Sequence, residues 1–165
     1  MSKLAAEKYC FAFHKVYNLP TVSVRYFNAY GPRQDTSEYA NAVSIFLSRT
    51  REGKPLTIFG DGEQTRDFIF IDDIVNANIL AAIHPAAVGE IFNISTGVVH
   101  SINQLVKILG DITGREIPLS HAAPRAGEVR HSRANIDKAR KLLGYSPKTN
   151  LNEGLLLTWK EVIKE

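Results

Sequence analysis

Segments with helical spacing alternate with short β-type segments along most of this sequence. Residues 2–17 carry apolar side chains three and four positions apart, whereas residues 21–27 alternate β-branched and aromatic side chains. The same change recurs between the helical pattern over 43–50 and the strand pattern over 56–59. This alternation predicts an α/β fold with partly parallel strand pairing, and it excludes all-helical and all-β folds.

Polar side chains at the starts of helical patterns predict where helices begin. Ser101 and Gln104 have the spacing of a capping box, which places a helix start at this point. Asp72 or Asp73 is expected to cap the helix of the next apolar stretch, and Asn152 is expected to cap the last helix.

Two polar stretches are expected to form loops. Residues 28–39 follow the strand expected over 21–27, and residues 121–134 follow a short strand pattern. Open α/β sheets bind ligands outside the carboxyl ends of their strands. The first loop is therefore a candidate functional segment.

Composition narrows the class of protein and its setting. Hydrophobic residues make up 44% and charged residues 22% of the 165 positions, which excludes disordered and fibrous classes. The formal net charge is only +3 and the charges are scattered, so we expect no nucleic acid partner. No apolar run is long enough for a bilayer, and the single cysteine, Cys10, favours the cytoplasm. The histidines follow no metal-ligand spacing, so we expect no metal site.

The first helical segment carries more apolar surface than one buried stripe requires. Its stripe includes Ala5 and Phe13, and its other faces carry Leu4, Cys10 and Phe11. A second packing partner is implied. We expect this helix to form the interface of a homodimer.

Five segments, in this order, resemble extended short-chain dehydrogenases of the NAD-dependent epimerase/dehydratase family. The segments are Ser-Lys-Leu-Ala-Ala-Glu at 2–7, Arg-Tyr-Phe-Asn-Ala-Tyr-Gly-Pro-Arg at 25–33, Phe-Gly-Asp-Gly-Glu-Gln-Thr-Arg-Asp-Phe at 59–68, Phe-Asn-Ile-Ser-Thr-Gly at 92–97 and Leu-Leu-Gly-Tyr-Ser-Pro at 142–147. The second segment is most similar to that of UDP-glucose 4-epimerases, because Ala29 stands where sugar 4,6-dehydratases tend to have a second Asn.

The resemblance implies that the chain is the carboxyl-terminal, substrate-binding half of such an enzyme. In the family a catalytic Tyr lies four residues before the Lys that matches Lys3, which places it before Met1 and outside the chain, and no glycine-rich dinucleotide loop occurs in the sequence. We therefore expect a fragment. Residues 1–40 would be the end of a Rossmann-type dinucleotide-binding domain, and residues 41–165 a smaller α/β nucleotide-sugar-binding domain with segments that pack back on the first.

The resemblance also assigns polar side chains to a nucleotide sugar. Arg66 and Arg125 match the family's contacts to the diphosphate, and Arg33 lies in a third loop where it could join them. Glu128 matches a contact to the ribose hydroxyls, where Asp is the usual residue, and Asn28 matches an amide near the phosphates. The alternatives are solvent-facing arginines and an ordinary turn asparagine.

Other assignments concern apolar positions. Phe59 matches an aromatic residue at the uracil pocket and could equally be the end of a core strand. Ala42 and Val43 match backbone donors to the nucleotide at a helix start, although Asn41 could simply cap that helix.

Two further residues match positions that bind NAD in the family. They are Lys3, which in the family holds the nicotinamide ribose and lowers the pKa of the catalytic Tyr, and Phe27. Without that Tyr, an exposed lysine in the first helical turn is the simpler interpretation of Lys3.

The leading hypothesis is an NAD-dependent UDP-glucose/UDP-galactose 4-epimerase. In the family, Tyr takes the proton of the sugar 4-hydroxyl while hydride passes from C4 to NAD and returns to the other face. We expect this chain alone to be inactive. The alternatives are a non-catalytic UDP-sugar-binding or dimerisation module, or part of a UDP-glucuronate decarboxylase or sugar 4,6-dehydratase.

Overall fold

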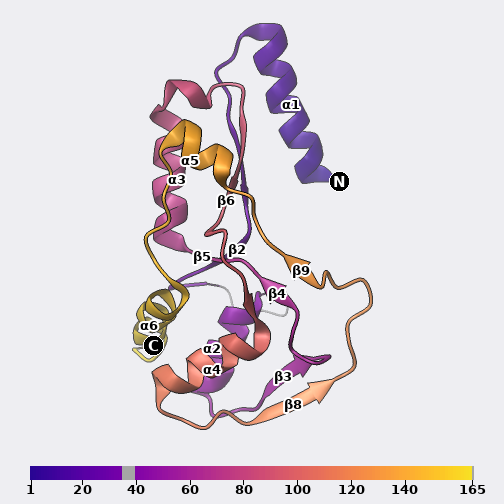
Figure 1. Ribbon diagram of the computed structural model, residues 1–165, viewed down its shortest axis with the longest axis vertical. Coiled ribbons are helices and arrows are strands. Elements are labelled where there is room, and N and C mark those ends of the chain that lie inside the picture. Colours follow the sequence, from indigo (N-terminus) through magenta and orange to yellow (C-terminus); the bar gives the residue numbers. More distant parts are fainter. Residues whose placement is uncertain (35–39, 165) are drawn as a thin grey trace.

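A computed structural model describes residues 1–34 and 40–164 (Figure 1). In chain order the elements are α1 (Ser2–Tyr17), β1 (Ser23–Tyr26), β2 (Asn28–Tyr30), α2 (Ala42–Arg51), β3 (Leu56–Phe59), β4 (Thr65–Arg66), β5 (Phe68–Phe70), α3 (Ile71–Ile83), the 3₁₀ turn η1 (Pro85–Ala87), β6 (Ile91–Ile94), β7 (His100–Ser101), α4 (Ile102–Thr113), β8 (Leu119–Ala122), β9 (His131–Ser132), α5 (Asp137–Leu143) and α6 (Leu151–Val162). Within these ranges, no helix is both long and apolar enough to cross a membrane.

The strands pair mostly in parallel, which confirms the predicted α/β class. Parallel pairs join β1 to β6, β2 to β5, β3 to β8 and β4 to β9, and β4 also pairs antiparallel with β7. Each pair joins segments far apart in the sequence, because parallel strands need a long crossover connection. The position of each loop is therefore set by tertiary contacts.

Two hydrophobic cores lie at opposite ends of the elongated molecule and meet at β5. One core contains side chains of α2, β3, α4 and α6, and the other contains side chains of α3, β6 and α5 (Figure 1). Successive side chains of a strand point to opposite faces. Accordingly, Phe68 and Phe70 enter the first core, and Ile69 enters the second.

Asp67 lies between β4 and β5 with a fully buried carboxylate. That carboxylate accepts bonds from the hydroxyls of Ser95 (2.6 Å) and Thr96 (2.7 Å) and from the amides of Thr96 (3.1 Å), Gly97 (3.0 Å) and Ala134 (3.1 Å). Its main-chain oxygen accepts from the side-chain amide of Asn28 at 3.0 Å. Asp67 thus ties together the point where the two cores meet.

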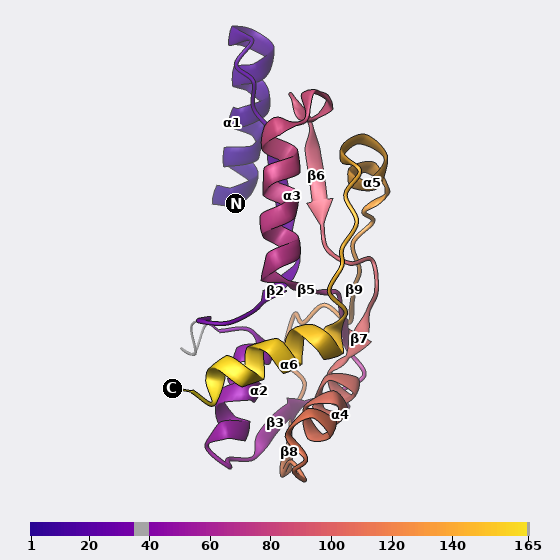
Figure 2. The same cartoon turned by 90° about the vertical axis from the view of Figure 1, so that its left-hand side faces the viewer.

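Helix α1 lies beside the rest of the molecule and buries none of its residues (Figures 1 and 2). Its contacts with the chain that follows include a two-bond ion pair between Glu7 and Arg25 (2.6 and 2.7 Å) and a bond from the Thr21 hydroxyl to the Cys10 carbonyl (2.9 Å). Six large apolar side chains on it are at least 45% exposed: Leu4, Tyr9, Phe11, Phe13, Val16 and Tyr17.

The helix starts test the predicted caps. The capping box is confirmed, because the Ser101 hydroxyl accepts from the amide of Gln104 (3.1 Å) and the Gln104 side chain accepts from the amide of Ser101 (2.9 Å). The prediction for Asn152 was wrong by two positions, since Asn150 caps α6. Asn150 stands immediately before the first turn and its side chain accepts from the amide of Glu153, whereas Asn152 already lies within that turn.

The predicted cap at Asp72 or Asp73 was wrong. Phe70 occupies the N-cap position of α3, and Asp73 is buried. The Asp73 carboxylate instead accepts from the amides of Lys148 (2.8 Å) and Thr149 (3.0 Å), which a distant segment supplies.

The predicted loop over 28–39 is only partly a loop. Its first residues form β2, because Asn28, Ala29 and Tyr30 pair with β5. The part at residues 35–39 lies outside the described residues.

Replacing Asp67 is expected to destabilise the protein strongly. Asp67→Ala leaves five donors, all buried or partly buried, without this acceptor, so we expect the free energy of unfolding to fall by about 3–5 kcal/mol. Urea denaturation, monitored by circular dichroism, measures this free energy of unfolding. Asp111→Ala is the matched control, because the Asp111 side chain is 67% exposed and pairs only with Lys107 at the surface. Equal losses for the two variants would contradict the structural role of Asp67.

Candidate functional site

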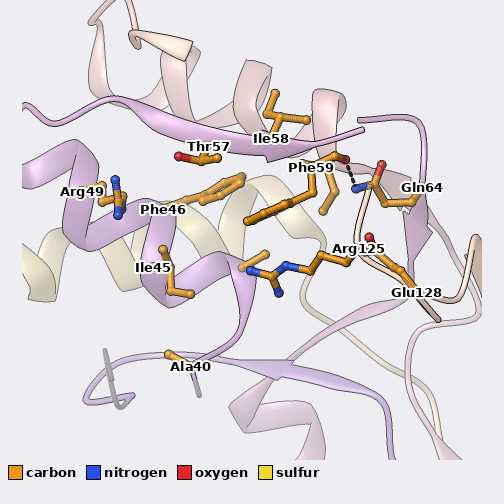
Figure 3. A pocket seen from close by; sticks show the side chains of 12 residues that line it. Ala40, Ile45, Phe46, Arg49, Thr57, Ile58, Phe59, Gln64, Arg125 and Glu128 are labelled. Atoms are coloured by element: carbon orange, nitrogen blue, oxygen red, sulfur yellow. Dashed lines mark hydrogen bonds between the residues drawn. The ribbon is translucent and has the colours of Figure 1, made fainter. Parts of the chain in front are cut away.

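A cavity of about 270 Å³ lies between α2, β3 and the segment that follows β8 (Figure 3). A second cavity of about 480 Å³ adjoins it. Phe59, Gln64, Arg125 and Glu128 line both. These four side chains therefore form the wall that the two cavities share.

Arg125 stacks on the ring of Phe59. The guanidinium carbon lies 3.9 Å from the ring centroid, a cation–π contact (Figure 3). The parallel pairing of β3 with β8 brings the two residues together, since it places Phe59 opposite Ala122, three residues before Arg125. The stack presents a positive charge and an aromatic surface at one place.

Glu128 and Arg66 form an ion pair beside this stack. The Arg66 Nη2 donates to Glu128 Oε1 at 2.8 Å, and its Nη1 donates to the Thr65 carbonyl at 2.9 Å. The Arg66 and Glu128 side chains are 16% and 28% exposed. Arg66 does not line either cavity, and it reaches the shared wall through Glu128.

Gln64 is a further residue of the wall that sequence reasoning did not single out. Its side chain is buried, and its Nε2 donates to the Phe59 carbonyl at 2.9 Å (Figure 3). Its Oε1 is buried without a hydrogen-bond partner among the described residues. Gln64 stands inside the segment 59–68, but a glutamine in a sequence gives no sign that its oxygen will be unpaired.

Asp61 and Arg130 form an ion pair at the edge of the second cavity. Two bonds of 2.7 and 2.8 Å join the guanidinium to the carboxylate. These bonds, followed by the amide of Glu63, hold the pKa of Asp61 well below its usual value. The charge of Arg130 is therefore matched within the chain, while Arg125 has an aromatic neighbour.

The structure brings several predicted site residues together. Phe59, Arg125, Glu128 and Ala42 line the first cavity, and Arg66 joins them through its ion pair. Val43, next to Ala42 in α2, has a fully buried side chain in the first core.

The other predicted residues lie elsewhere. The Asn28 side chain donates to Asp67, and Arg33 lines a different cavity of about 210 Å³. Phe27 packs against the second core, and Lys3 is exposed on α1. The expected convergence of Arg33 with the other two arginines was therefore wrong, since Arg33 lies on the α2–α6 side of the molecule. In residues 1–34 and 40–164, no group of three or more His, Cys, Asp or Glu could hold a metal ion.

Comparison with known proteins identifies the family of this chain. The description "NAD dependent epimerase/dehydratase family" belongs to the family model that matches residues 1–95. The chain is 39% identical over 157 residues to the UDP-glucose 4-epimerase of Mycolicibacterium smegmatis, which covers 94% of the chain and 50% of that protein. It is 37% identical over 155 residues to an uncharacterized UDP-glucose epimerase of Bacillus subtilis, which covers 94% of the chain and 48% of that protein.

A solved structure agrees with these matches. The crystal structure of UDP-glucose 4-epimerase with UDP-glucose from Thermotoga maritima has a TM-score of 0.93 and 42% identity, covering 98% of this chain and 52% of that one. The fold is α/β and matches the Rossmann-like part of an NAD-dependent epimerase. The chain belongs to the NAD-dependent epimerase/dehydratase family, which uses NAD, and it is homologous to UDP-sugar 4-epimerases. It spans about half the length of the curated relatives it matches.

The family match corrects one expectation from the sequence. The chain was expected to be a carboxyl-terminal, substrate-binding half, but the matched residues 1–95 are the N-terminal part of the chain. The parallel pairs β1–β6 and β2–β5 lie entirely within that range. The matched part is thus the Rossmann-like part, and the assignment as a substrate-binding half was wrong.

The ion pair of Arg66 and Glu128 is expected to show measurable coupling. A double-mutant cycle with Arg66→Ala and Glu128→Ala, measured by urea denaturation, is expected to give about 1 kcal/mol. The reason is that both side chains are largely covered, so solvent screens the pair weakly. The more exposed pair of Asp61 and Arg130 serves as the comparison and is expected to give a smaller coupling. A larger coupling for the exposed pair would contradict this account.

Proposed function

We propose that the two adjoining cavities bind the nucleoside diphosphate part of a UDP-sugar. The single observation that carries the proposal is the stack of Arg125 on Phe59 in the wall that the cavities share. An aromatic ring offers a surface for a base, and a guanidinium pairs with phosphate oxygens through two parallel bonds. The stack therefore supplies both kinds of contact that a nucleotide requires.

The residues beside the stack of Arg125 on Phe59 carry groups that can bind the other parts of a nucleotide. Arg66 lies beside Glu128 and supplies a second guanidinium, and the Glu128 carboxylate can accept bonds from ribose hydroxyls. Ala42 and Val43 stand in the first turn of α2, whose amides lack partners within the helix. In this proposal their main-chain amides donate to the nucleotide.

We propose that the whole protein is a UDP-glucose/UDP-galactose 4-epimerase. The matches to UDP-glucose 4-epimerases support this choice. A UDP-glucuronate 4-epimerase of Thermodesulfobacterium geofontis (38% identity) and a UDP-glucuronic acid decarboxylase of Xenopus tropicalis (32% identity) support two alternatives. A sugar 4,6-dehydratase and a non-catalytic UDP-sugar-binding module are further alternatives.

NAD supplies hydride transfer at the sugar when it is bound to an enzyme of this kind. The described residues fit NAD poorly, because Lys3 is exposed on α1 and Phe27 packs into the second core, and the sequence has no glycine-rich phosphate loop. We therefore expect the 165-residue chain alone to bind UDP without epimerase turnover.

We propose a domain division and a setting on the same grounds. Residues 1–40 would belong to a Rossmann-type dinucleotide-binding domain and residues 41–165 to a nucleotide-sugar-binding domain. In this division α3, β6 and α5 are the segments of the second domain that pack back on the first, because they share the second core with Val22, Val24 and Phe27. The cytoplasm is the proposed location.

We also propose that two copies associate through α1. The six exposed apolar side chains of this helix favour such an interface, because large apolar patches on water-exposed surfaces usually mark association sites. The ring pair of Phe13 and Tyr17, with centroids 5.3 Å apart, would lie within it.

Calorimetry with UDP tests the proposed binding site. We expect micromolar affinity for the wild-type chain and a loss of about tenfold or more for Arg125→Ala, because a charge-assisted bond to phosphate is removed. Arg133→Ala is the matched control, since Arg133 is exposed and donates to the Gly97 carbonyl away from both cavities. UDP binding that Arg125→Ala leaves unchanged would reject the site.

Sedimentation velocity tests the proposed association. We expect the wild-type chain to sediment as a dimer and Phe13→Asp to sediment as a monomer, because a buried, unpaired carboxylate is costly at an interface. Lys8→Asp changes the charge of the same helix without removing apolar surface and is the control. A monomeric wild type would refute the dimer.

A further inference from the structure

Another cavity, of about 520 Å³, lies apart from the candidate nucleotide site. Residues of β5, of the segment 96–100, of α5 and of the segment 147–152 line it, and we call it the His100 cavity. It shares no lining residue with the two cavities of the nucleotide site. Figure 2 shows α5 and β7 on the side of the molecule away from α1. A ligand of this cavity would therefore be a molecule other than the proposed nucleotide.

His100 contributes to this cavity a ring nitrogen that lacks a hydrogen-bond partner. Its Nδ1 atom is buried and has no partner in the described part of the chain. Buried polar atoms are nearly always hydrogen-bonded in native structures, so this nitrogen calls for a partner from outside the chain. The main chain of His100 is fixed, because β7 pairs with β4 and the next residue, Ser101, caps α4.

The imidazole of His100 is neutral at pH 7. Burial lowers its pKa, although the negative charge of Asp67 acts in the opposite direction. A neutral imidazole donates through one nitrogen and accepts through the other. Nδ1 can therefore donate to a ligand oxygen or accept from a ligand donor, and the charges around the cavity decide between the two.

Two cations and no carboxylate are among the described residues that line the His100 cavity. Lys148 has no ion-pair partner in residues 1–34 and 40–164, and Arg140 is 54% exposed and reaches Asp137 only at 4.0 Å. The carboxylates of Asp67 and Asp73, which contact residues of the wall, already accept from main-chain amides. The cavity thus favours an anion, to which Nδ1–H of the imidazole would donate.

The remaining wall of the cavity is partly apolar. Phe68 and Leu151 line it and are 4% and 6% exposed, and Val98 and Pro147 line it as well. An inorganic ion would leave this surface against water, whereas the apolar body of an organic anion would cover it. The wall therefore fits a ligand that has acceptor oxygens at one end and an apolar body at the other.

We infer that the His100 cavity binds a small organic carboxylate. The His100 Nδ1–H donates to a carboxylate oxygen, and Lys148 and Arg140 supply the opposite charge. Phe68 and Leu151 contact the apolar body. The inference does not depend on the proposed function, because it uses no residue of the nucleotide site.

An NMR titration of the ¹⁵N-labelled chain with benzoate tests the inference. Benzoate joins a carboxylate to an apolar ring, benzyl alcohol has the ring without the charge, and inorganic phosphate has the charge without the ring. At constant ionic strength we expect saturable benzoate shifts at the amides of residues 96–100 and 147–152. We expect benzoate to bind about fivefold or more tightly than either comparison ligand.

Variants of the cavity are measured with the same three ligands. His100→Phe keeps a ring without the nitrogen, and Lys148→Met removes the charge, so we expect each to weaken benzoate binding about threefold or more. His100→Asn retains an N–H donor and is expected to retain binding, which preserves the test if His100→Phe does not fold. Lys141→Met is the matched control, because Lys141 is exposed on α5 and does not line the cavity.

Each outcome bears on the inference. Benzoate binding that His100→Phe and Lys148→Met weaken and Lys141→Met leaves unchanged supports it. Absence of saturable shifts, shifts confined to residues outside the cavity, or equal effects of Lys148→Met and Lys141→Met overturn it. Equal affinity for benzyl alcohol would show that the charge is not recognised, and equal affinity for phosphate would show that the apolar body is not, and either result also overturns the inference.

Discussion

The buried carboxylate of Asp67 is the contact on which the arrangement of the whole molecule depends. Its carboxylate oxygens accept five hydrogen bonds from two segments, residues 95–97 and Ala134, and no cation is among those donors. The next residue, Phe68, enters one core, and Ile69 enters the other. The preceding residue, Arg66, pairs with Glu128 at the shared cavity wall. The same few residues thus fix how the two cores meet and where a guanidinium stands in the candidate site.

Local features of the fold could be predicted from the sequence because their causes are local. The helix over Ser2–Tyr17 and the strand over Leu56–Phe59 have the predicted bounds, since the spacing of apolar residues alone determines them. The capping box of Ser101 and Gln104 involves residues three positions apart. The role of Asp73 could not be predicted in this way. Its carboxylate does not cap the helix, because it accepts from the amides of Lys148 and Thr149, which lie 75 and 76 residues away in the sequence.

From the sequence, site residues could be predicted only at positions that match the family's motifs. Phe59, Arg125 and Glu128 line the same cavity, because the pairing of β3 with β8 joins their segments. Arg33 carries the same charge as Arg125 but lines another cavity. A sequence shows that a residue is charged, but it does not show where its side chain points. Gln64 was missed for a related reason, since an unpaired oxygen is a property of the packed wall.

The central claim is that the wall formed by Phe59, Gln64, Arg125 and Glu128 binds a nucleoside diphosphate. An NMR titration of the ¹⁵N-labelled chain with UDP tests it most directly, because backbone amides report where a ligand binds. We predict saturable shifts confined to the amides of residues 57–66 and 122–130 and of the first turn of α2. Shifts confined to other residues, such as the segment 147–152, or no saturable shift at all, would contradict the claim.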